Sequence, residues 1–517
     1  MQYAQSSRPA RLILAVLLLT GVGLRLAYVH RPVDHRLVSP WRQCDYLQIA
    51  RNYWREEPNI LYPRIDWRRD TPGYVESEFP FIPWAGARLF DFFGYREWLL
   101  RAVSALFGIA SLFVFVRLCR KLLPVGGVLF ATAAFALNPL LFHLSTALQP
   151  ESVMVFGSIL AVLLLVRWGE RPGFGRLLAA AAAVALAILG KAPAACLGLP
   201  FVWVLWQRLG HGLLRNNQVL VAGALAVLPP VAWYAWAAHF WRQYGNSLGV
   251  SNGNHPLTLG MLLPPIFLLG ILKWETLGLF MPTGWLLALC ALCAPRKQST
   301  IPWVWYLSAW VVYVAAAHTT SADWAFYYHS LSVAPGCLLM GAGFQALVEG
   351  RVLPRSGVLL PSLARWAAGA LAAATLGALA ASVVVFVRFR DGRTDLLALR
   401  TCARELAHYV PEKALIVVKG NEAEFDDRGH PLPFNIPMAF TWMDRKGFNY
   451  GTRDLSVKQL EVIASRGGRY WLAYGSDFDS EQFRAEVGKR FRLVARCKDG
   501  FFLYDLQGHV AGLSKEP

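Results

Sequence analysis

The chain has 517 residues, of which 55% are hydrophobic and only 16% are charged, and its net charge is +18. A soluble globular protein carries about 25% charged residues, so this composition does not suit a set of soluble domains. It also excludes disordered, collagen-like and disulfide-scaffold proteins, and it predicts a polytopic membrane protein.

Near-continuous apolar runs of roughly 17–25 residues are typical of membrane-spanning helices. We expect about eleven such helices, at residues 11–29, 98–116, 125–142, 152–166, 177–190, 192–206, 218–237, 277–294, 301–317, 330–348 and 366–387. The first is expected to remain as an uncleaved helix, because no small-residue cleavage site follows it. The apolar stretch 257–272 contains Pro264 and Pro265, and we expect it to be re-entrant or interfacial.

The distribution of Lys and Arg among the short connections predicts the orientation. One set of connections holds 15 cations: Arg8, Arg11, Arg117, Arg120, Lys121, Arg167, Arg171, Arg176, Arg208, Arg215, Arg296, Lys297, Arg351, Arg355 and Arg365. The alternate set holds only Lys191, Arg242 and Lys273. The positive-inside rule therefore places the N-terminus inside and, after eleven crossings, the C-terminus outside. The basicity is a topology signal, so it gives no reason to expect a nucleic-acid partner.

We expect a membrane domain of residues 1–387 and a separate domain of residues 388–517. Two long segments are expected outside the membrane, one within the first domain and the other forming the second domain. The first segment, 30–97, has an amphipathic helix pattern at 43–57 and an interfacial helix pattern at 79–93. The second segment alternates helical stretches with β-rich runs, which predicts a small α/β domain. We expect helices at 392–409, 455–466 and 479–487, and strands at 414–418, 470–474, 491–495 and 501–506.

Polar side chains gather at the predicted outside face rather than at the helix centres. They are Asp45, Glu76, Glu78, His143, Glu151, Lys191, His239, Arg242, His318, Asp323, Tyr327, Tyr328 and His329. A transporter or lipid flippase usually needs ionisable groups near the bilayer midplane, so this distribution favours an enzyme at the outer surface. The alternative is that outside helix ends carry polar residues in any membrane protein.

The order of short motifs resembles a known family. The motifs are W-R-Q-C-D-Y (41–46), N-I-L-Y-P-R-I-D-W (59–67), G-Y-V-E-S-E-F-P (73–80), R-A-V-S (101–104), Q-P-E (149–151) and L-G-K-A-P (189–193). Over roughly residues 10–350 the chain resembles bacterial membrane glycosyltransferases of the GT-C fold. These are related to protein O-mannosyltransferases and to the aminoarabinose transferase that modifies lipid A.

The resemblance implies a polyprenyl-phosphate-linked sugar donor and transfer, with inversion, to an acceptor hydroxyl at the periplasmic face of a bacterial inner membrane. The acceptor would be a lipid, a glycan or a protein. The alternative enzyme is a ligase or polymerase that moves a pyrophosphate-linked glycan. No cofactor is indicated, and no ligand cluster in the sequence requires a divalent metal.

The resemblance also implies roles for particular residues. Asp45 matches the catalytic base, and Glu151 and Glu78 match two further acidic positions. Because the leaving group is a lipid phosphate, we expect cations to hold it. The substrate-binding candidates are Lys191, Arg64, Arg242, His239, His143, Tyr328 and His329.

Each of these residues also has a structural alternative. Asp45 could cap a helix, and Lys191 could extend from a helix end toward the membrane surface. Tyr327, Tyr328 and His329 could form an interfacial aromatic belt, and Glu76 is expected to be a solvated loop charge.

Cys402 and Cys497 are the two cysteines of the predicted outside domain. An oxidising compartment would allow them to form a disulfide, whereas the alternative is two separately buried thiols.

Overall fold

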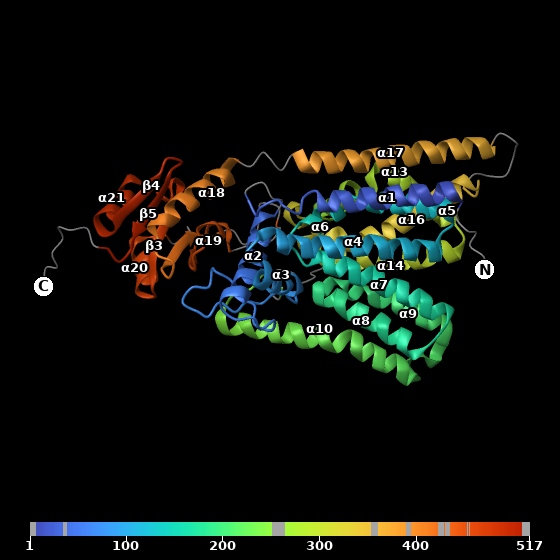
Figure 1. The fold of residues 1–517 in the computed structure, drawn as a ribbon, viewed down its shortest axis with the longest axis horizontal. Helices are drawn as coiled ribbons and strands as arrows, with labels where there is room; N and C mark the ends of the chain where they lie inside the picture. Colours follow the sequence, from blue (N-terminus) through green and yellow to red (C-terminus); the bar gives the residue numbers. More distant parts are fainter. Residues whose placement is uncertain are drawn as a thin grey trace. The chain divides into compact units, whose positions relative to one another are not determined.

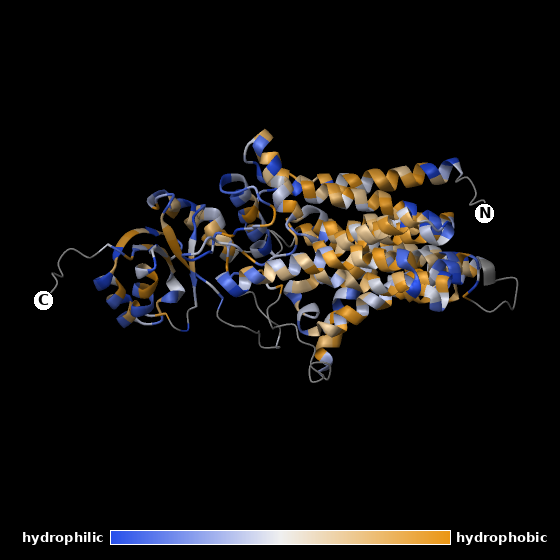
Figure 2. Ribbon diagram, turned by 90° about the horizontal axis from the view of Figure 1, so that it is seen from below, coloured by the Kyte–Doolittle hydropathy of each residue, from blue (hydrophilic) through white to orange (hydrophobic). Residues whose placement is uncertain are grey.

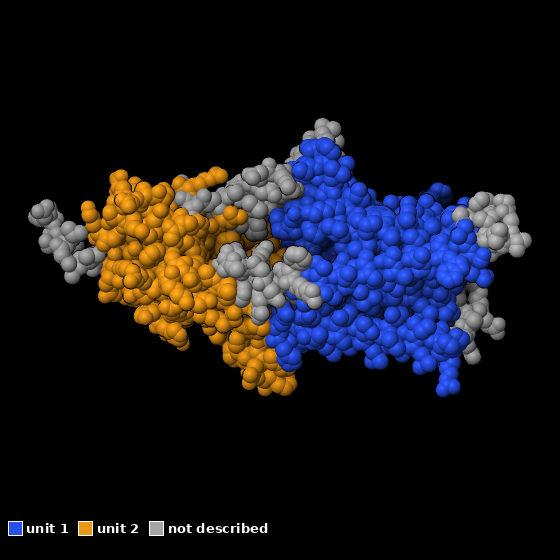
Figure 3. Space-filling model, turned by 90° about the horizontal axis from the view of Figure 1, so that it is seen from above, with its two compact units in different colours: residues 1–31, 101–236, 253–388 blue, residues 32–100, 237–252, 389–517 orange. Residues whose placement is uncertain are grey.

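A computed structural model describes residues 7–34, 39–250, 264–352, 360–388, 394–421, 429, 435–451, 453 and 455–508. The chain divides into two compact units (Figure 3). Unit 1 comprises residues 1–31, 101–236 and 253–388, and unit 2 comprises residues 32–100, 237–252 and 389–517. The predicted loop 30–97 thus falls almost wholly in the same unit as the C-terminal domain, and the predicted domain boundary at residue 387 stays a prediction.

Unit 1 is a bundle of helices (Figure 1), and apolar residues cover most of their length (Figure 2). The elements are α1 (Arg8–Leu26), α4 (Glu97–Leu122), α5 (Val125–Ala136), α6 (Pro139–Thr146), α7 (Glu151–Glu170), α8 (Phe174–Gly190), η1 (Ala192–Leu197), α9 (Gly198–Leu209), η2 (Gly210–Arg215), α10 (Asn217–Tyr244), α12 (Pro265–Glu275), the π-turn η3 (Thr276–Phe280), α13 (Met281–Cys290), η4 (Ala291–Cys293), α14 (Arg296–Ala315), α15 (Ala317–Thr320), η5 (Asp323–His329), α16 (Ser330–Val348) and α17 (Leu360–Arg388). Each of the eleven predicted runs overlaps at least one of these helices. Helices α4 and α10 have residues in both units.

Seven helical segments among the described residues are long and apolar enough to cross a membrane. They are Arg8–Leu26, Glu97–Leu122, Glu151–Glu170, Asn217–Tyr244, Pro265–Cys293, Asp323–Val348 and Ser362–Val387. The pair α5 and α6 makes an eighth if it is one span bent by 53°. Pro139 at the start of α6 explains the break, because proline cannot donate to the preceding turn. The prediction of a multi-pass helical membrane protein is confirmed.

The stretch 257–272 differs from its prediction where the structure describes it. Residues 257–263 lie outside the described residues. The remaining residues begin α12, which continues through η3 and α13 as one candidate span, Pro265–Cys293. The predicted span 277–294 therefore begins about three helical turns earlier in the structure, and Pro265 stands in its first turn, where a missing N–H is tolerated.

Small residues allow α16 to pack closely on α5. A Cβ at Gly341 would lie 2.7 Å from the backbone oxygen of Gly127, and a Cβ at Gly127 would lie 2.9 Å from that of Gly341. Both positions therefore require glycine. Close approach of this kind is how helices associate in membranes, where the hydrophobic effect between helices is weak.

Unit 2 contains α2 (Pro40–Arg55), α3 (Phe81–Phe93) and a five-stranded mixed sheet with helices around it (Figure 1). The strands are β1 (Leu415–Lys419), β2 (Gly447–Tyr450), β3 (Gly468–Tyr474), β4 (Arg492–Cys497) and β5 (Phe501–Asp505), and the helical elements of this part are α18 (Thr394–Leu406), η7 (Ala407–Tyr409), α19 (Met438–Met443), α20 (Val457–Ser465), η8 (Gly475–Asp477) and α21 (Glu481–Arg490). The order is β2-β1-β3-β5-β4; β1 is parallel to β2 and β3, and β5 is antiparallel to β3 and β4. The C-terminal α/β domain is confirmed, whereas β2 and α19 were not predicted.

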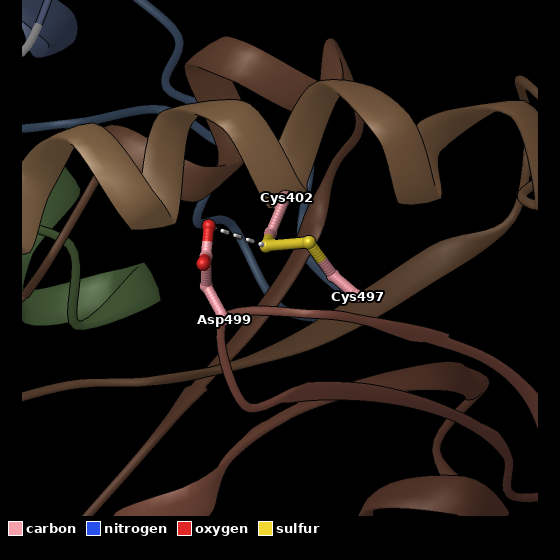
Figure 4. Close-up of side chains that lie close together, drawn as sticks. All are labelled: Cys402, Cys497 and Asp499. Carbon is pink, nitrogen blue, oxygen red and sulfur yellow. Dashed lines mark hydrogen bonds between the residues drawn. A yellow bond between two sulfur atoms is a disulfide. The ribbon is translucent and has the colours of Figure 1, made fainter.

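Cys402 on α18 and Cys497 at the end of β4 form a disulfide, with their Cα atoms 5.6 Å apart (Figure 4). The bridge ties the helix to the edge strand of the sheet. Asp499 lies beside it, with Oδ2 4.0 Å from the Cys402 sulfur. These three residues are also close enough to share a metal ion. Because thiolates are the ligands that bind metals, the bridged sulfurs do not make this cluster a metal site.

Candidate active site

Asp45 lies inside α2, as its sixth residue, so it does not cap that helix. Its side chain is buried, and Oδ1 accepts a 2.8 Å hydrogen bond from Nε1 of Trp67. Nearly the whole of α2, which belongs to unit 2, is buried, from Pro40 to Tyr53. A carboxyl group in these surroundings is shielded from bulk water and held in one orientation.

Burial raises the pKa of Asp45 to about 7. The hydrogen bond from Trp67 and the positive charge of Arg42 lower it in part, and the negative charges of Asp66 and Glu78 add to the increase. A general base works best when its pKa lies near the working pH, because it is then both ionised and basic. Asp45 therefore has the properties of a base for chemistry at neutral pH.

Glu78 forms a buried ion pair with Arg42, with 2.5 Å between Oε1 and Nη2. Tyr46 donates a 3.1 Å hydrogen bond to the other carboxylate oxygen, and Arg42 also donates to the backbone oxygen of Leu248 at 2.8 Å. Arg42, Asp45 and Tyr46 are three and four residues apart, so they share one face of α2. In this arrangement Glu78 fixes Arg42 beside the candidate base, and a direct part for Glu78 in catalysis stays a prediction.

The position of Trp67 depends on its neighbour Asp66. Asp66 Oδ2 accepts a 2.8 Å hydrogen bond from Arg51, and Oδ1 accepts one of 2.9 Å from Asn52. The backbone amide of Asp66 donates to Oε1 of Gln48 at 3.1 Å. Three side chains of α2 thus hold this segment, which brings the Trp67 indole to Asp45. Trp67 is part of the motif at 59–67, but its role as a hydrogen-bond partner was not predicted.

The other basic candidates of unit 2 lie elsewhere. Arg64 is bound by carboxylates of Glu56 and Glu57 and by the hydroxyl of Tyr74, 3.0 Å away. His239 and Arg242 are exposed on the last turns of α10. The substrate-binding roles of Arg64, His239 and Arg242 stay predictions, but Arg64 already has two negatively charged partners.

Glu76 is not the solvated loop charge that the sequence suggested. Its side chain is fully buried, and the hydroxyl of Ser247 donates to Oε2. The backbone amide of Glu76 also donates to Asn246 at 3.0 Å, so this residue anchors the first loop to the segment that follows α10.

Unit 1 contains a second cluster, in which Lys191 is paired with Glu151. Both side chains are buried, and the Lys191 ammonium contacts the Glu151 carboxylate directly. The ammonium also lies 4.6 Å from the ring centre of Tyr327 and 4.2 Å from that of Tyr328. Lys191 therefore does not extend to the membrane surface, and the two tyrosines contact a buried cation.

Gln149, two residues before Glu151, was not proposed as a site residue. It is fully buried, and neither polar atom of its carboxamide has a hydrogen-bond partner among the described residues. Buried polar atoms are normally satisfied, so an unsatisfied carboxamide indicates a place where a ligand or water binds. Its place in the Q-P-E motif was the available signal.

The two histidine candidates of unit 1 are buried. His143 lies against the rings of Phe326 and Phe386, about 5 Å from each centre. His329 contacts Glu275 Oε1 through Nδ1 at 2.7 Å and the backbone oxygen of Thr320 through Nε2 at 2.9 Å. Their roles as ligands stay predictions, although both ring nitrogens of His329 are already engaged inside the protein.

Comparisons with known proteins identify a related family and related folds. Residues 72–236 match the family described as dolichyl-phosphate-mannose-protein mannosyltransferase, a segment that includes Glu78, Glu151 and Lys191. No curated protein sequence matches the chain.

Several solved structures share the fold. The chain is similar to ArnT from Cupriavidus metallidurans in the apo state, with 15% identity over 98% of both chains and a TM-score of 0.61. For the same protein bound to undecaprenyl phosphate, the values are 16% identity, 99% and 100% of the two chains and a TM-score of 0.62. It is also similar to the oligosaccharyltransferase AglB from Archaeoglobus fulgidus in complex with an inhibitory peptide and a dolichol-phosphate, at 12% identity over 90% and 69% of the two chains, with a TM-score of 0.53.

The chain thus has the fold of GT-C glycosyltransferases, and one segment carries the signature of the mannosyltransferase family. The resemblance drawn from the motifs is confirmed. The family match and these structural similarities agree with the predicted class of enzyme, a glycosyltransferase that depends on a polyprenyl-phosphate sugar.

Proposed function

We propose that the protein transfers a sugar from a polyprenyl-phosphate donor to an acceptor hydroxyl, with inversion at the anomeric carbon. The observation that carries this proposal is Asp45, a buried carboxyl group with a pKa of about 7 that is oriented by Trp67. The similarity to a structure of ArnT bound to undecaprenyl phosphate supports the choice of donor lipid.

The proposed reaction is a single displacement. Asp45 takes the proton of the acceptor hydroxyl, whose oxygen attacks the anomeric carbon from the face opposite the phosphate. The bond between that carbon and the phosphate oxygen breaks, and the lipid phosphate leaves as an anion. Because an alcohol is a weak nucleophile, its attack is helped by a base that takes its proton, which typically contributes about 10²- to 10⁴-fold to the rate. The cation of Lys191 is proposed to bind the donor phosphate.

An assay with purified protein in lipid nanodiscs tests this function. The donors are undecaprenyl phosphates carrying single radiolabelled sugars, and the acceptors are lipid and glycan extracts of a bacterial envelope. We expect one donor to yield labelled product and free undecaprenyl phosphate, with the opposite anomeric configuration in the product. Turnover that requires a pyrophosphate-linked donor would instead support a ligase or polymerase.

We also propose eleven membrane crossings in a bacterial inner membrane, with the N-terminus inside and unit 2 on the periplasmic side. The disulfide between Cys402 and Cys497 supports this orientation, because such bonds persist in oxidising compartments. Three of the eleven predicted runs correspond to α8, to η1 with α9, and to α14, which are not among the seven or eight candidate spans.

Cysteine labelling tests the orientation. Lys489 on α21 and Gly173 before α8 are both exposed, and Cys293, also exposed, is first replaced by serine. We expect a membrane-impermeant thiol reagent to label Lys489→Cys in intact spheroplasts. Gly173→Cys should react only after the membrane is opened. The reverse pattern would invert the topology.

A further inference from the structure

A polar pocket of about 500 Å³ lies in unit 2 beside β2, one of the two edge strands of the sheet. The first loop and the end of α10 contribute Trp67, Arg69 and Asn246 to its lining. The C-terminal domain contributes residues of β2 and α20. This volume lies within the range typical of small-molecule sites, which is about 300–1,000 Å³.

The polar lining of this pocket consists mainly of carboxamide and guanidinium groups, beside the Tyr450 hydroxyl, which donates to Asp477. The carboxamide and guanidinium groups are those of Asn246, Asn435, Asn449 and Gln459, together with Arg69, Arg453 and Arg466. No carboxylate stands among the described residues that line it. Nη2 of Arg466 lies 2.5 Å from Oδ1 of Asp70, a residue that does not line the pocket. The net charge of the lining side chains is therefore positive even when this pair is counted as neutral. Carboxamides bind hydroxyl groups and guanidinium groups bind phosphates or carboxylates, so the lining suits an anionic, hydroxyl-rich ligand.

Two acceptors at this pocket are unsatisfied. The side-chain oxygens Oδ1 of Asn449 and Oε1 of Gln459 are buried and have no hydrogen-bond partner among the described residues. The orientation of the Asn449 carboxamide is fixed, because Nδ2 donates to the backbone oxygen of Val418 at 3.2 Å. A buried acceptor without a donor costs free energy, which hydroxyl groups of a ligand would restore.

The wall formed by the first loop is fixed by backbone contacts. Arg69 has a φ of 58°, a conformation that is uncommon for residues other than glycine. Its backbone amide donates to the oxygen of Gly447 at 2.7 Å, and its guanidinium donates to the backbone oxygen of Tyr244 at 2.6 Å. An unfavourable conformation that is held from two sides is frequent at ligand sites.

We propose that this pocket binds an anionic sugar, such as a phosphorylated sugar or a sugar acid, and that this sugar is part of the acceptor. The claim that this sugar is part of the acceptor rests on the proposed function. Trp67 connects the two sites, because it lines the pocket and its indole nitrogen donates to Asp45. An acceptor sugar bound in this pocket would contact Trp67, which in turn contacts the candidate base Asp45.

Binding of glucose 6-phosphate to the purified full-length protein tests whether the pocket binds an anionic sugar. The 6-phosphate is chosen because the donor carries its phosphate at the anomeric position. We expect wild type to bind glucose 6-phosphate at least about tenfold more tightly than glucose or inorganic phosphate. The double variant Gln459→Leu/Arg453→Gln should weaken this binding about tenfold or more, and Val462→Trp, which places a large side chain at the pocket, should abolish it.

The matched control is Gln482→Leu/Arg496→Gln. It makes the same chemical changes at exposed positions on α21 and on β4, the strand at the opposite edge of the sheet. It should bind glucose 6-phosphate like wild type. Unchanged binding in both pocket variants, with the disulfide intact and a wild-type melting temperature, would overturn the proposal.

Transfer assays separate this proposal from the proposed function. Asp45→Asn should keep glucose 6-phosphate binding while transfer is lost. If the wild-type protein binds the sugar phosphate but transfers nothing from any polyprenyl-phosphate donor, the pocket stands and the proposed function fails. If transfer occurs and the pocket variants leave the acceptor KM unchanged, the pocket is not an acceptor site.

Discussion

Asp45→Asn is expected to lower sugar transfer by roughly 10²- to 10⁴-fold, because that is the usual contribution of a positioned general base. The amide keeps the shape of the side chain and can still accept the hydrogen bond from Trp67, so folding should be preserved. The matched control is Asp91→Asn, which removes an exposed carboxylate paired with Arg88 on α3. Turnover of the Asp45 variant within threefold of wild type would exclude the assignment.

The pH dependence of the wild-type protein gives a second measurement of the same group. Because the pKa of Asp45 is about 7, the active carboxylate form should be lost as the pH falls through 7. We expect kcat/KM to decrease about tenfold for each pH unit below that value. A rate that stays constant between pH 5 and 7 would mean that the essential base is a different group.

The raised pKa of Asp45 also has a consequence for stability. The group contributes stability that is fully present below its ordinary pKa of 3.8 and is lost as the pH rises through about 7. The difference of about three between the two values corresponds to about 4 kcal/mol at most. Asp45→Asn, which is neutral throughout, should therefore melt at a higher temperature than wild type at pH 8, with little difference near pH 4. Equal melting temperatures at pH 8 would argue against a buried, ionised Asp45.

Most of the secondary structure could be predicted because it depends on the local pattern of apolar and polar residues. Each predicted apolar run overlaps a helix, and the strands β1, β3, β4 and β5 are rich in apolar and aromatic residues. The strand β2, Gly447–Tyr450, was missed because Gly and Asn have low strand propensity. Its formation depends on its neighbour: a Cβ at Gly447 would lie only 1.8 Å from the backbone oxygen of Ile416, so glycine there permits close pairing with β1.

Residues of the candidate site could be predicted where they belong to a motif, but their contacts with distant residues could not. Asp45 could be proposed from its motif, but its partner Trp67 lies 22 residues later and meets it only when the intervening segment folds back onto α2. Glu76 was wrongly expected to be solvated, because its partner Ser247 is 171 residues away. The sequence likewise gave no sign that Lys191 and Glu151, 40 residues apart, form a buried pair. Contacts at such separations depend on packing and not on local pattern.

Lys191→Met is expected to weaken donor use by about 10- to 100-fold, since a charge-assisted hydrogen bond to the donor phosphate is worth roughly 1.5–3 kcal/mol. The single change also leaves Glu151 as an unpaired buried carboxylate. Removing one partner of a buried pair typically costs about 3–5 kcal/mol, so this variant should be less stable as well. A loss of activity in the single variant therefore does not by itself identify a donor contact.

The double variant Lys191→Met/Glu151→Gln separates these two effects. Removing both charges leaves no unpaired carboxylate, so the melting temperature should recover most of the loss. If Lys191 binds donor phosphate, the donor KM should remain raised at least tenfold despite the recovered stability. The control is Lys121→Met, which breaks an exposed pair with Glu170 and should change neither quantity, because such pairs are worth about 0–1 kcal/mol. Recovery of both the melting temperature and the donor kinetics in the double variant would instead show that Lys191 serves only to neutralise Glu151.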